Sequence, residues 1–103
     1  MPESDDFVPV EVMPELIKKG KPEYPKIALR ERKECTVYLR VLISENGYVN
    51  DVVIQKTDDP NWQWGFNEAV LEAAIHCRFK PAIQKGKPVK VWVSFPYEFI
   101  LHR

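Results

Sequence analysis

The last part of the chain carries the clearest hydrophobic pattern. Apolar side chains occupy every second position from Val89 to Leu101, and the positions between them are mixed. This alternation is typical of a β-strand with one buried face, although the segment is longer than the usual five or six residues. Pro96 has no backbone N–H, so the pattern predicts a long final strand that lies at a sheet edge or contains a bulge. An exposed edge is a template for another strand.

A second alternating segment predicts a β-hairpin. Apolar residues alternate from Val37 to Ile43, and Val49–Ile54 supplies the returning strand. Asn46 and Gly47 lie between them, and this pair is a strong hairpin signal because both residues tolerate positive φ. The alternation shifts between Val49 and Val52, which predicts either a β-bulge or a change of pairing in the returning strand. Residues 57–65 are expected to form a loop.

One amphipathic helix is predicted between the hairpin and the final strand. The apolar residues at intervals of three and four that define its buried stripe are Phe66, Ala69, Val70, Ala73, Ala74 and Cys77. Glu68 and Glu72 lie outside the stripe, and Pro81 sets the limit of the helix. The order of hairpin, helix and strand predicts an α+β fold, in which one main helix packs on one face of a three-stranded antiparallel sheet.

The beginning of the chain is predicted to be extended. Residues 1–6 are acidic and are expected to be mobile, and prolines interrupt the apolar residues of 7–17. We therefore divide the chain into an extended N-terminal lead-in, residues 1–20, and a folded domain, residues 21–103. Ile27–Arg32 is expected to form a short first helix.

Composition restricts the classes of protein that remain. A chain of 103 residues with 45% hydrophobic content suits one domain with its own core. Fifteen basic and fifteen acidic residues cancel, which does not favour nucleic acid or an anionic membrane as a partner. No apolar run reaches the length of a membrane span, of about 18 residues, and the start lacks the pattern of a signal peptide. We expect the domain to be a piece of a longer protein.

Cysteine, histidine and tryptophan residues are the remaining candidates for chemistry. Cys35 and Cys77 are either separate core residues or a bridged pair. A thiol oxidoreductase is disfavoured because redox pairs are usually close in sequence, as in a CxxC motif. His76 and His102 lack further ligands at suitable spacing, so no metal is expected. Trp62 and Trp64 either stack on a sugar or peptide ligand, or pack down their own loop, which is the favoured reading.

The order of several short motifs resembles the C-terminal domain of TonB, the energy transducer of Gram-negative envelopes. The resemblance spans Pro14 to Phe99, and its specificity comes from the order and spacing of the motifs together. The segments that carry it are Pro22-Glu23-Tyr24-Pro25, Val37–Ile43, Gly47-Tyr48-Val49, Ala69 with Ala73-Ala74, Phe79-Lys80-Pro81-Ala82 and Gly86-Lys87-Pro88-Val89.

The resemblance implies a periplasmic binding module with no enzymatic activity and no cofactor. In the family, an N-terminal inner-membrane span and a proline-rich linker precede the domain, and an inner-membrane motor complex drives it with the proton gradient. The domain grips the N-terminal peptide of an outer-membrane transporter, which then imports siderophores, cobalamin, haem or glycans. Binding occurs by strand addition to the last strand, and the same edge allows homodimers.

Carried onto this sequence, the resemblance implies a set of partner-binding residues. They are Lys21, Pro22, Glu23, Tyr24 and Pro25 in the lead-in, and Val89, Lys90, Val91, Trp92, Val93, Ser94 and Phe95 in the last strand. We expect charged residues at the rim to set specificity, because main-chain pairing does not discriminate sequences.

The chain departs from the family pattern at three places. Lys21 and Glu23 stand where amide side chains are common. Cys35 and Cys77 replace a glycine and a tryptophan of the family, and if those two normally pack together, the cysteines are expected to form a disulfide in the oxidising periplasm. An alternative function is a TonB-like docking domain appended to an envelope sensor or a membrane peptidase.

Overall fold

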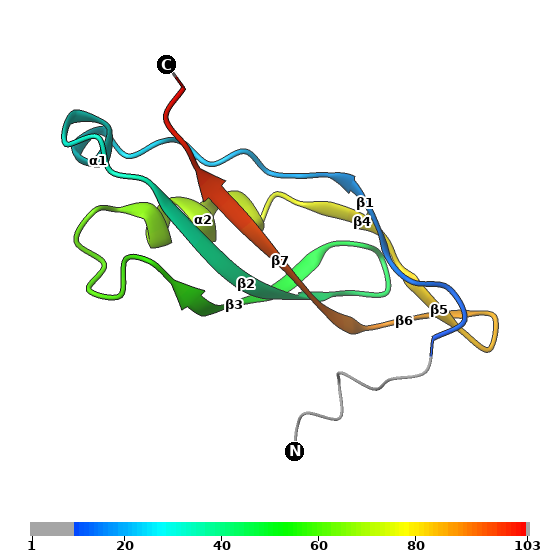
Figure 1. Ribbon diagram of the computed structural model, residues 1–103. Coiled ribbons are helices and arrows are strands. Elements are labelled where there is room, and N and C mark those ends of the chain that lie inside the picture. The colour runs from blue at the N-terminus through cyan, green and yellow to red at the C-terminus, as the bar shows by residue number, and fades with distance from the viewer. Residues whose placement is uncertain (1–9, 103) are drawn as a thin grey trace.

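The computed structural model describes residues 10–102 and has the predicted α+β architecture (Figure 1). Its three-stranded sheet is antiparallel, with the strand order β3-β2-β7. The strands are β2 (Cys35–Ile43), β3 (Val49–Thr57) and β7 (Val91–Phe99). The main helix, α2 (Phe66–Ala74), lies along one face of this sheet.

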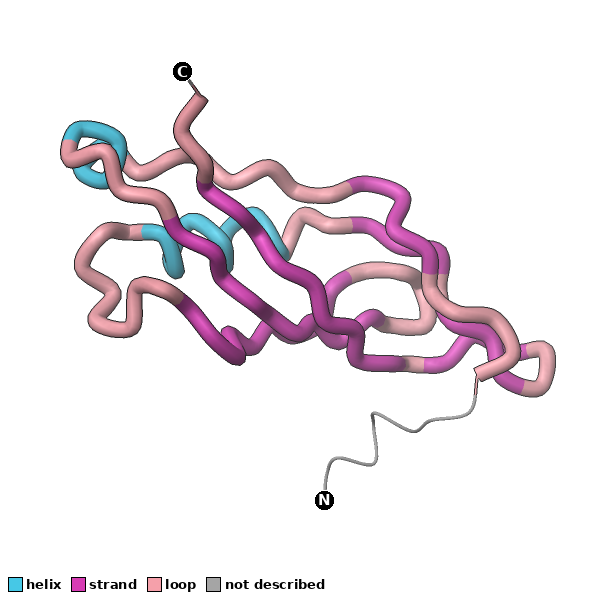
Figure 2. Tube along the Cα trace, in the orientation of Figure 1, coloured by secondary structure: helices cyan, strands magenta, loops and turns pink. Residues whose placement is uncertain are grey.

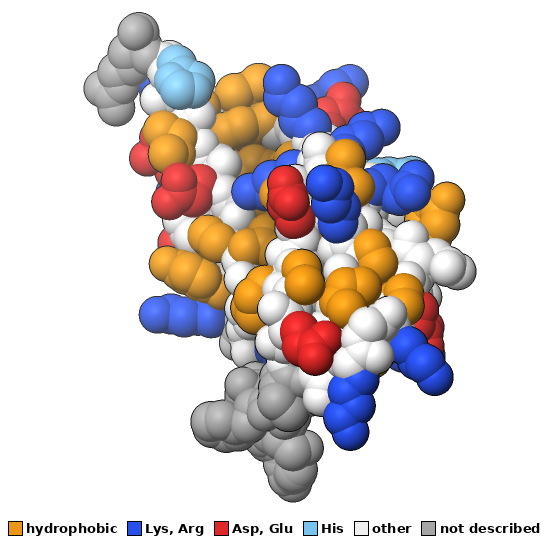
Figure 3. Space-filling model, turned by 90° about the vertical axis from the view of Figure 1, so that its right-hand side faces the viewer, with side chains coloured by type: hydrophobic (Ala, Val, Ile, Leu, Met, Phe, Trp, Pro, Cys, Tyr) orange, Lys and Arg blue, Asp and Glu red, His pale blue; other side chains and the backbone are white. Residues whose placement is uncertain are grey.

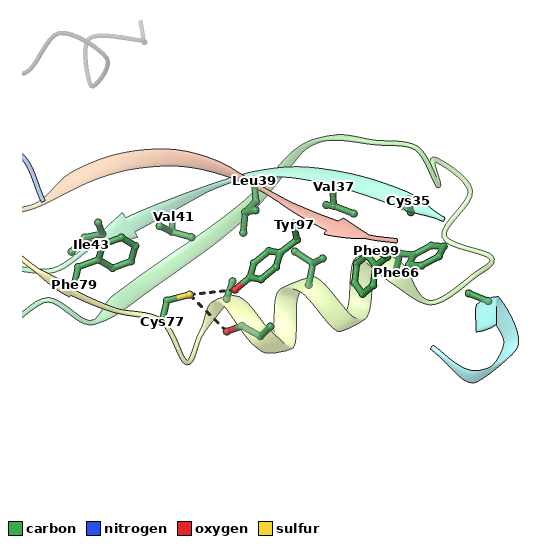
Figure 4. Close-up of a cluster of buried hydrophobic side chains, with 14 residues drawn as sticks. Cys35, Val37, Leu39, Val41, Ile43, Phe66, Cys77, Phe79, Tyr97 and Phe99 are labelled. Carbon is green, nitrogen blue, oxygen red and sulfur yellow. Dashed lines mark hydrogen bonds between the residues drawn. The ribbon is translucent and has the colours of Figure 1, made fainter. Parts of the chain in front are cut away.

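The core lies between α2 and the sheet (Figure 4). Every odd-numbered residue of β2 is buried, as the alternation predicts, and faces the stripe of α2 that contains Phe66 and Val70. Tyr97 and Phe99 of β7 complete this layer. Because burial of one large apolar side chain contributes about 1.5–3 kcal/mol, this layer is the main source of stability.

The hairpin between β2 and β3 closes through a three-residue loop. Ser44 N–H donates to the Tyr48 carbonyl over 2.8 Å, and Gly47 N–H donates to the Ser44 carbonyl over 3.0 Å. Gly47 has a φ of 87°, whereas Asn46 is not among the residues with positive φ. The predicted hairpin is therefore confirmed, and its three-residue loop uses only one left-handed residue, Gly47.

The returning strand is irregular at two places. The register between β2 and β3 shifts between Leu42 and Ile43, which leaves Asn50 as an extra residue. This confirms the bulge predicted after Val49. A second shift, between Tyr38 and Leu39, leaves Gln55 unpaired and has no clear signal in the sequence. Both bulges increase the twist of the hairpin.

The lead-in is extended, but from Val12 onward it is also paired. Strand β1 (Glu15–Lys18) forms an antiparallel ribbon with β4 (Arg78–Lys80), and Val12 bridges to Ile83. The expected mobile residues 1–6 lie outside the described part of the chain. The short first helix is α1 (Lys26–Arg30). Among residues 10–102, neither helix is long and apolar enough to cross a membrane.

The long final strand is interrupted at Lys90. Residues before it form β6 (Lys87–Val89), which pairs with β5 (Ala82–Gln84) in a separate hairpin at the end of the molecule (Figure 2). The prediction of one unbroken strand is therefore wrong. Its cause is the length of β2, which pairs with β7 from Cys35 to Ile43 and then turns away, so it offers no partner to residues 87–89.

Candidate functional site

One edge of the main sheet is open. Strand β7 pairs with β2 on one side, and none of residues 10–102 forms a strand on its other side. Pro96 lies opposite Tyr38 in this pairing. The Pro96 carbonyl accepts a hydrogen bond from Lys19 Nζ over 3.2 Å, which places that carbonyl on the open side. Pro96 therefore belongs to a pair that is not hydrogen-bonded in the ladder.

The direction of the Pro96 carbonyl fixes the direction of the backbone N–H and C=O groups of the neighbouring residues in β7. In an antiparallel ladder, pairs that are hydrogen-bonded alternate with pairs that are not. The backbone N–H and C=O groups of Trp92, Ser94 and Glu98 therefore point to the open side with the Pro96 carbonyl. Pro96 itself leaves one gap in the row of donors. Such a row of unpaired groups is a template for an additional strand.

A groove of about 600 Å³ lies beside the second half of this edge, between β7 and the end of the lead-in. Its lining residues come from two segments: Lys19, Gly20, Lys21, Pro22 and Tyr24 on one wall, and Pro96, Tyr97, Glu98, Phe99 and Ile100 on the other. Seen end-on, the molecule shows a hollow lined by hydrophobic side chains below the C-terminal end of the chain, with basic side chains near its rim (Figure 3).

A buried cluster of hydrogen bonds among Gly20, Cys77 and Tyr97, which we call the node, holds the lead-in wall of the groove in place. The Tyr97 hydroxyl donates to the Gly20 carbonyl over 2.7 Å, and Gly20 N–H donates to Cys77 Sγ over 3.3 Å. Cys77 Sγ also lies 3.3 Å from the Tyr97 hydroxyl (Figure 4). A Cβ on Gly20 would lie 1.9 Å from the Ala73 carbonyl oxygen. Only glycine allows the lead-in to approach the last turn of α2 so closely.

Tyr24 anchors the same wall at its other end. Its ring meets Phe66 and Phe99 edge-on, with centroids 5.8 and 5.5 Å away, and its hydroxyl donates to the Lys33 carbonyl. Edge-to-face aromatic pairs contribute about 0.5–1.5 kcal/mol beyond the area that they bury. The Tyr24-Pro25 segment is thus tied to the core directly beside the groove.

Burial determines the protonation of both anchoring tyrosines. Burial, together with the Cys77 thiol, raises the pKa of Tyr97 far above its ordinary value of 10.0. The pKa of Tyr24 is also raised, by burial first and then by the charges of Glu34 and Cys35. Both hydroxyls therefore remain hydrogen-bond donors throughout the physiological range.

The structure brings together some of the expected partner-binding residues and separates others. Lys21, Pro22 and Tyr24 line the groove, whereas Glu23 and Pro25 border a separate hollow of about 310 Å³ beside α2. Val91–Phe95 forms the first half of β7, while Val89 lies in β6 and Lys90 in the break between the strands.

Several groove residues were not among those expected from the sequence. They are Lys19, Gly20, Pro96, Tyr97, Glu98, Phe99 and Ile100. The missing N–H of Pro96 was the one sequence signal, because it marks an edge. It does not say which part of the edge faces the lead-in.

The expected disulfide between Cys35 and Cys77 is wrong. Both cysteines are free and buried. Cys35 Sγ lies 3.9 Å from Thr57 Oγ1, at the end of β3 and beside the start of α2, whereas Cys77 follows the end of that helix. The two lie at opposite ends of α2 (Figure 4). A bridge needs Cα atoms within about 7 Å, which the length of the helix prevents.

The tryptophan loop is held mainly by a carboxylate. Asp59, which is buried, accepts hydrogen bonds from Gln63 N–H and Trp64 N–H over 3.2 and 3.0 Å. Trp62 is 43% exposed. The loop is thus packed down, as predicted, but through Asp59 more than through its own aromatic rings.

The histidines form no recognisable site. His76 Nε2 lies 3.4 Å from an oxygen of Glu72 on the helix surface, and His102 is exposed. Within residues 10–102, no three His, Cys, Asp or Glu side chains are grouped in a way that could hold a metal ion.

Comparison with known proteins agrees with this geometry. The family model described as "Gram-negative bacterial TonB protein C-terminal" matches residues 20–101. The chain is 33% identical over 81 residues to the protein tonB2 of Pseudomonas aeruginosa, which covers 79% of this chain but only 29% of that protein. Its fold is similar to the solution NMR structure of the Pseudomonas aeruginosa TonB CTD, with a TM-score of 0.69, 21% identity, and coverage of 87% and 88% of the two chains.

Proposed function

This chain belongs to the family of Gram-negative TonB C-terminal domains, and we propose that it captures an extended peptide of an outer-membrane transporter by strand addition to β7. The open edge of β7 beside the groove carries this proposal. The backbone groups of Ser94 and Glu98 would pair with the peptide, and Tyr24 and Phe99 would border its side chains.

The energetics of strand addition suit a shared adaptor. Each main-chain hydrogen bond contributes about 0.5–1.5 kcal/mol net, so a short peptide binds with modest affinity. Main-chain pairing depends little on the peptide sequence, so one domain can serve several transporters. A ladder pulled along its strands also loads several hydrogen bonds together, which suits brief transmission of force.

The wider role depends on the longer protein to which this domain belongs. The chain spans only 29% of the related tonB2 protein. We propose that the remaining part provides an inner-membrane anchor and contact with a proton-driven motor complex. The domain itself would act in the periplasm as a non-enzymatic link, so that the proton gradient drives import, for example of siderophores.

The experiment is a titration of ¹⁵N-labelled protein with a peptide from the N-terminus of a transporter of the same organism. We expect the largest amide shifts at Ser94 and Glu98, together with the opposite groove wall. Ser94→Pro should abolish binding and leave the fold intact, because it removes an N–H that points away from β2. Ser94→Ala is the matched control, since it keeps this N–H and should bind as the parent does.

The direction of each N–H also gives an internal test. Proline at Val93 removes a donor that points toward β2, so this variant should lose the fold itself. Shifts confined to α2 and β3, or unchanged binding by a folded Ser94→Pro variant, would contradict strand addition to β7.

A further inference from the structure

Lys19 occupies the place that an added strand would take. Its ammonium group donates to the Pro96 carbonyl and lies 5.4 Å and 4.6 Å from the ring centroids of Phe95 and Tyr97. The side chain thus reaches across the groove from the lead-in to the open edge of β7. Of the groove residues, Lys19 alone has a side-chain hydrogen bond to this edge among residues 10–102.

This contact competes with strand addition. An incoming strand that pairs with the edge brings a backbone N–H to the Pro96 carbonyl, where Lys19 Nζ now lies. The same strand would separate the ammonium group from the two rings. Lysine is one of the residues that natural proteins place at open edges to prevent unwanted pairing. Because Pro96 has no N–H, the edge is also weakest as a template at this point.

We propose that Lys19 guards the open edge of β7, and that a peptide with a carboxylate near the groove displaces it more readily than a neutral peptide does. This inference rests on the proposed peptide capture and adds the chemistry of the partner. An ammonium group that leaves a carbonyl and two aromatic faces needs a new anionic or polar partner. The groove walls carry Lys19 and Lys21 but only one carboxylate, that of Glu98. A peptide carboxylate is therefore favoured over a neutral residue.

The test measures binding of two capped synthetic peptides by fluorescence anisotropy. Both are short extended peptides of valine and threonine. One carries Asp at a terminal position and the other carries Asn at the same position. The pair is made once with this residue at the N-terminal end and once with it at the C-terminal end. The parent protein should bind the Asp peptide about tenfold more tightly at low salt, which corresponds to about 1.4 kcal/mol. Lys19→Met keeps the apolar stem but removes the charge, so it should bind the Asn peptide about tenfold more tightly than the parent and show a smaller preference for Asp.

Substitutions at two further lysines distinguish blocking of the β7 edge by Lys19 from simple attraction between lysine and the peptide carboxylate. Lys21 lines the groove without a hydrogen bond to the described residues of β7. Lys21→Met should reduce the preference for Asp without improving binding of the Asn peptide. Lys18 lies in β1 outside the groove, so Lys18→Met should leave both affinities unchanged. An unchanged or weaker affinity of Lys19→Met for the Asn peptide would overturn the proposal.

A measurement without peptide keeps the two proposals distinguishable. If no peptide binds to any of these proteins, peptide capture fails, and the guard is then tested by self-association. Removal of a guard exposes the edge to a second copy, so Lys19→Met should dimerise in sedimentation experiments at concentrations where the parent and Lys18→Met are monomeric. Equal sedimentation of all three proteins would then refute the guard.

Discussion

Tyr97→Phe tests whether the buried node at Gly20 holds the groove wall. The Tyr97 side chain is almost completely buried, and its hydroxyl donates to the Gly20 carbonyl over 2.7 Å. Removal of the hydroxyl leaves this buried carbonyl without its donor, which costs about 1–3 kcal/mol. One kcal/mol corresponds to about 4–8 °C for a domain of this size. We therefore expect Tm to fall by at least about 4 °C.

The same substitution should change the pH dependence of stability. Burial raises the pKa of Tyr97 above its ordinary value of 10.0. Its contribution to stability is therefore complete below pH 10, and it is lost as the pH rises above 10, because only the unfolded state then ionises. The loss is up to about 1.4 kcal/mol per pH unit for one group. Phenylalanine cannot ionise, so Tyr97→Phe should lose less stability than the parent above pH 10.

The assay is guanidinium unfolding, monitored by circular dichroism, at pH 7 and at several values above 10. Tyr38→Phe is the matched control, because Tyr38 is 44% exposed on the opposite face of the sheet. This control should leave the free energy of unfolding at pH 7 nearly unchanged. Burial also raises the pKa values of Tyr24 and Cys35, and these two groups likewise reduce stability at alkaline pH. Part of the loss of stability above pH 10 therefore remains in every variant. Equal stability of Tyr97→Phe and the parent at pH 7 would refute the role of the node.

Two further predictions concern glycine and cysteine. Gly47→Ala should destabilise the domain by more than about 2 kcal/mol in chemical unfolding, because its left-handed backbone disfavours a side chain and its Cβ would lie 2.0 Å from the Phe79 carbonyl oxygen. Gly86→Ala should cost only about 1 kcal/mol, since φ is 75° there but the added Cβ would have no atom within 4 Å apart from those of its chain neighbours. Equal losses in the two variants would contradict the clash at Gly47. Protein that is denatured without reduction and then alkylated should show two free thiols by mass spectrometry. In the folded state, Cys35 and Cys77 should react slowly because both are buried. An intact mass lower by two hydrogens would contradict the expectation of free thiols.

The sequence alone determined the elements that depend on local patterns. The alternation in β2 and the stripe of α2 recur at fixed intervals, so each identifies the face that must be buried. Gly47 marked the hairpin, and Pro96 marked an edge strand. These signals are local because backbone geometry sets the period of each element, and they were sufficient for the α+β fold.

Tertiary structure alone decided the groove and the partners of the short strands. Strand β4 has three residues, too few for a recognisable alternation, and it is stabilised by pairing with β1. The node that joins Tyr97 to Gly20 connects residues that are 77 positions apart. The separation of Cys35 from Cys77 follows from the length of α2, and the break at Lys90 follows from the end of β2. Such distances depend on how elements pack against one another, and no periodic pattern within one segment records them.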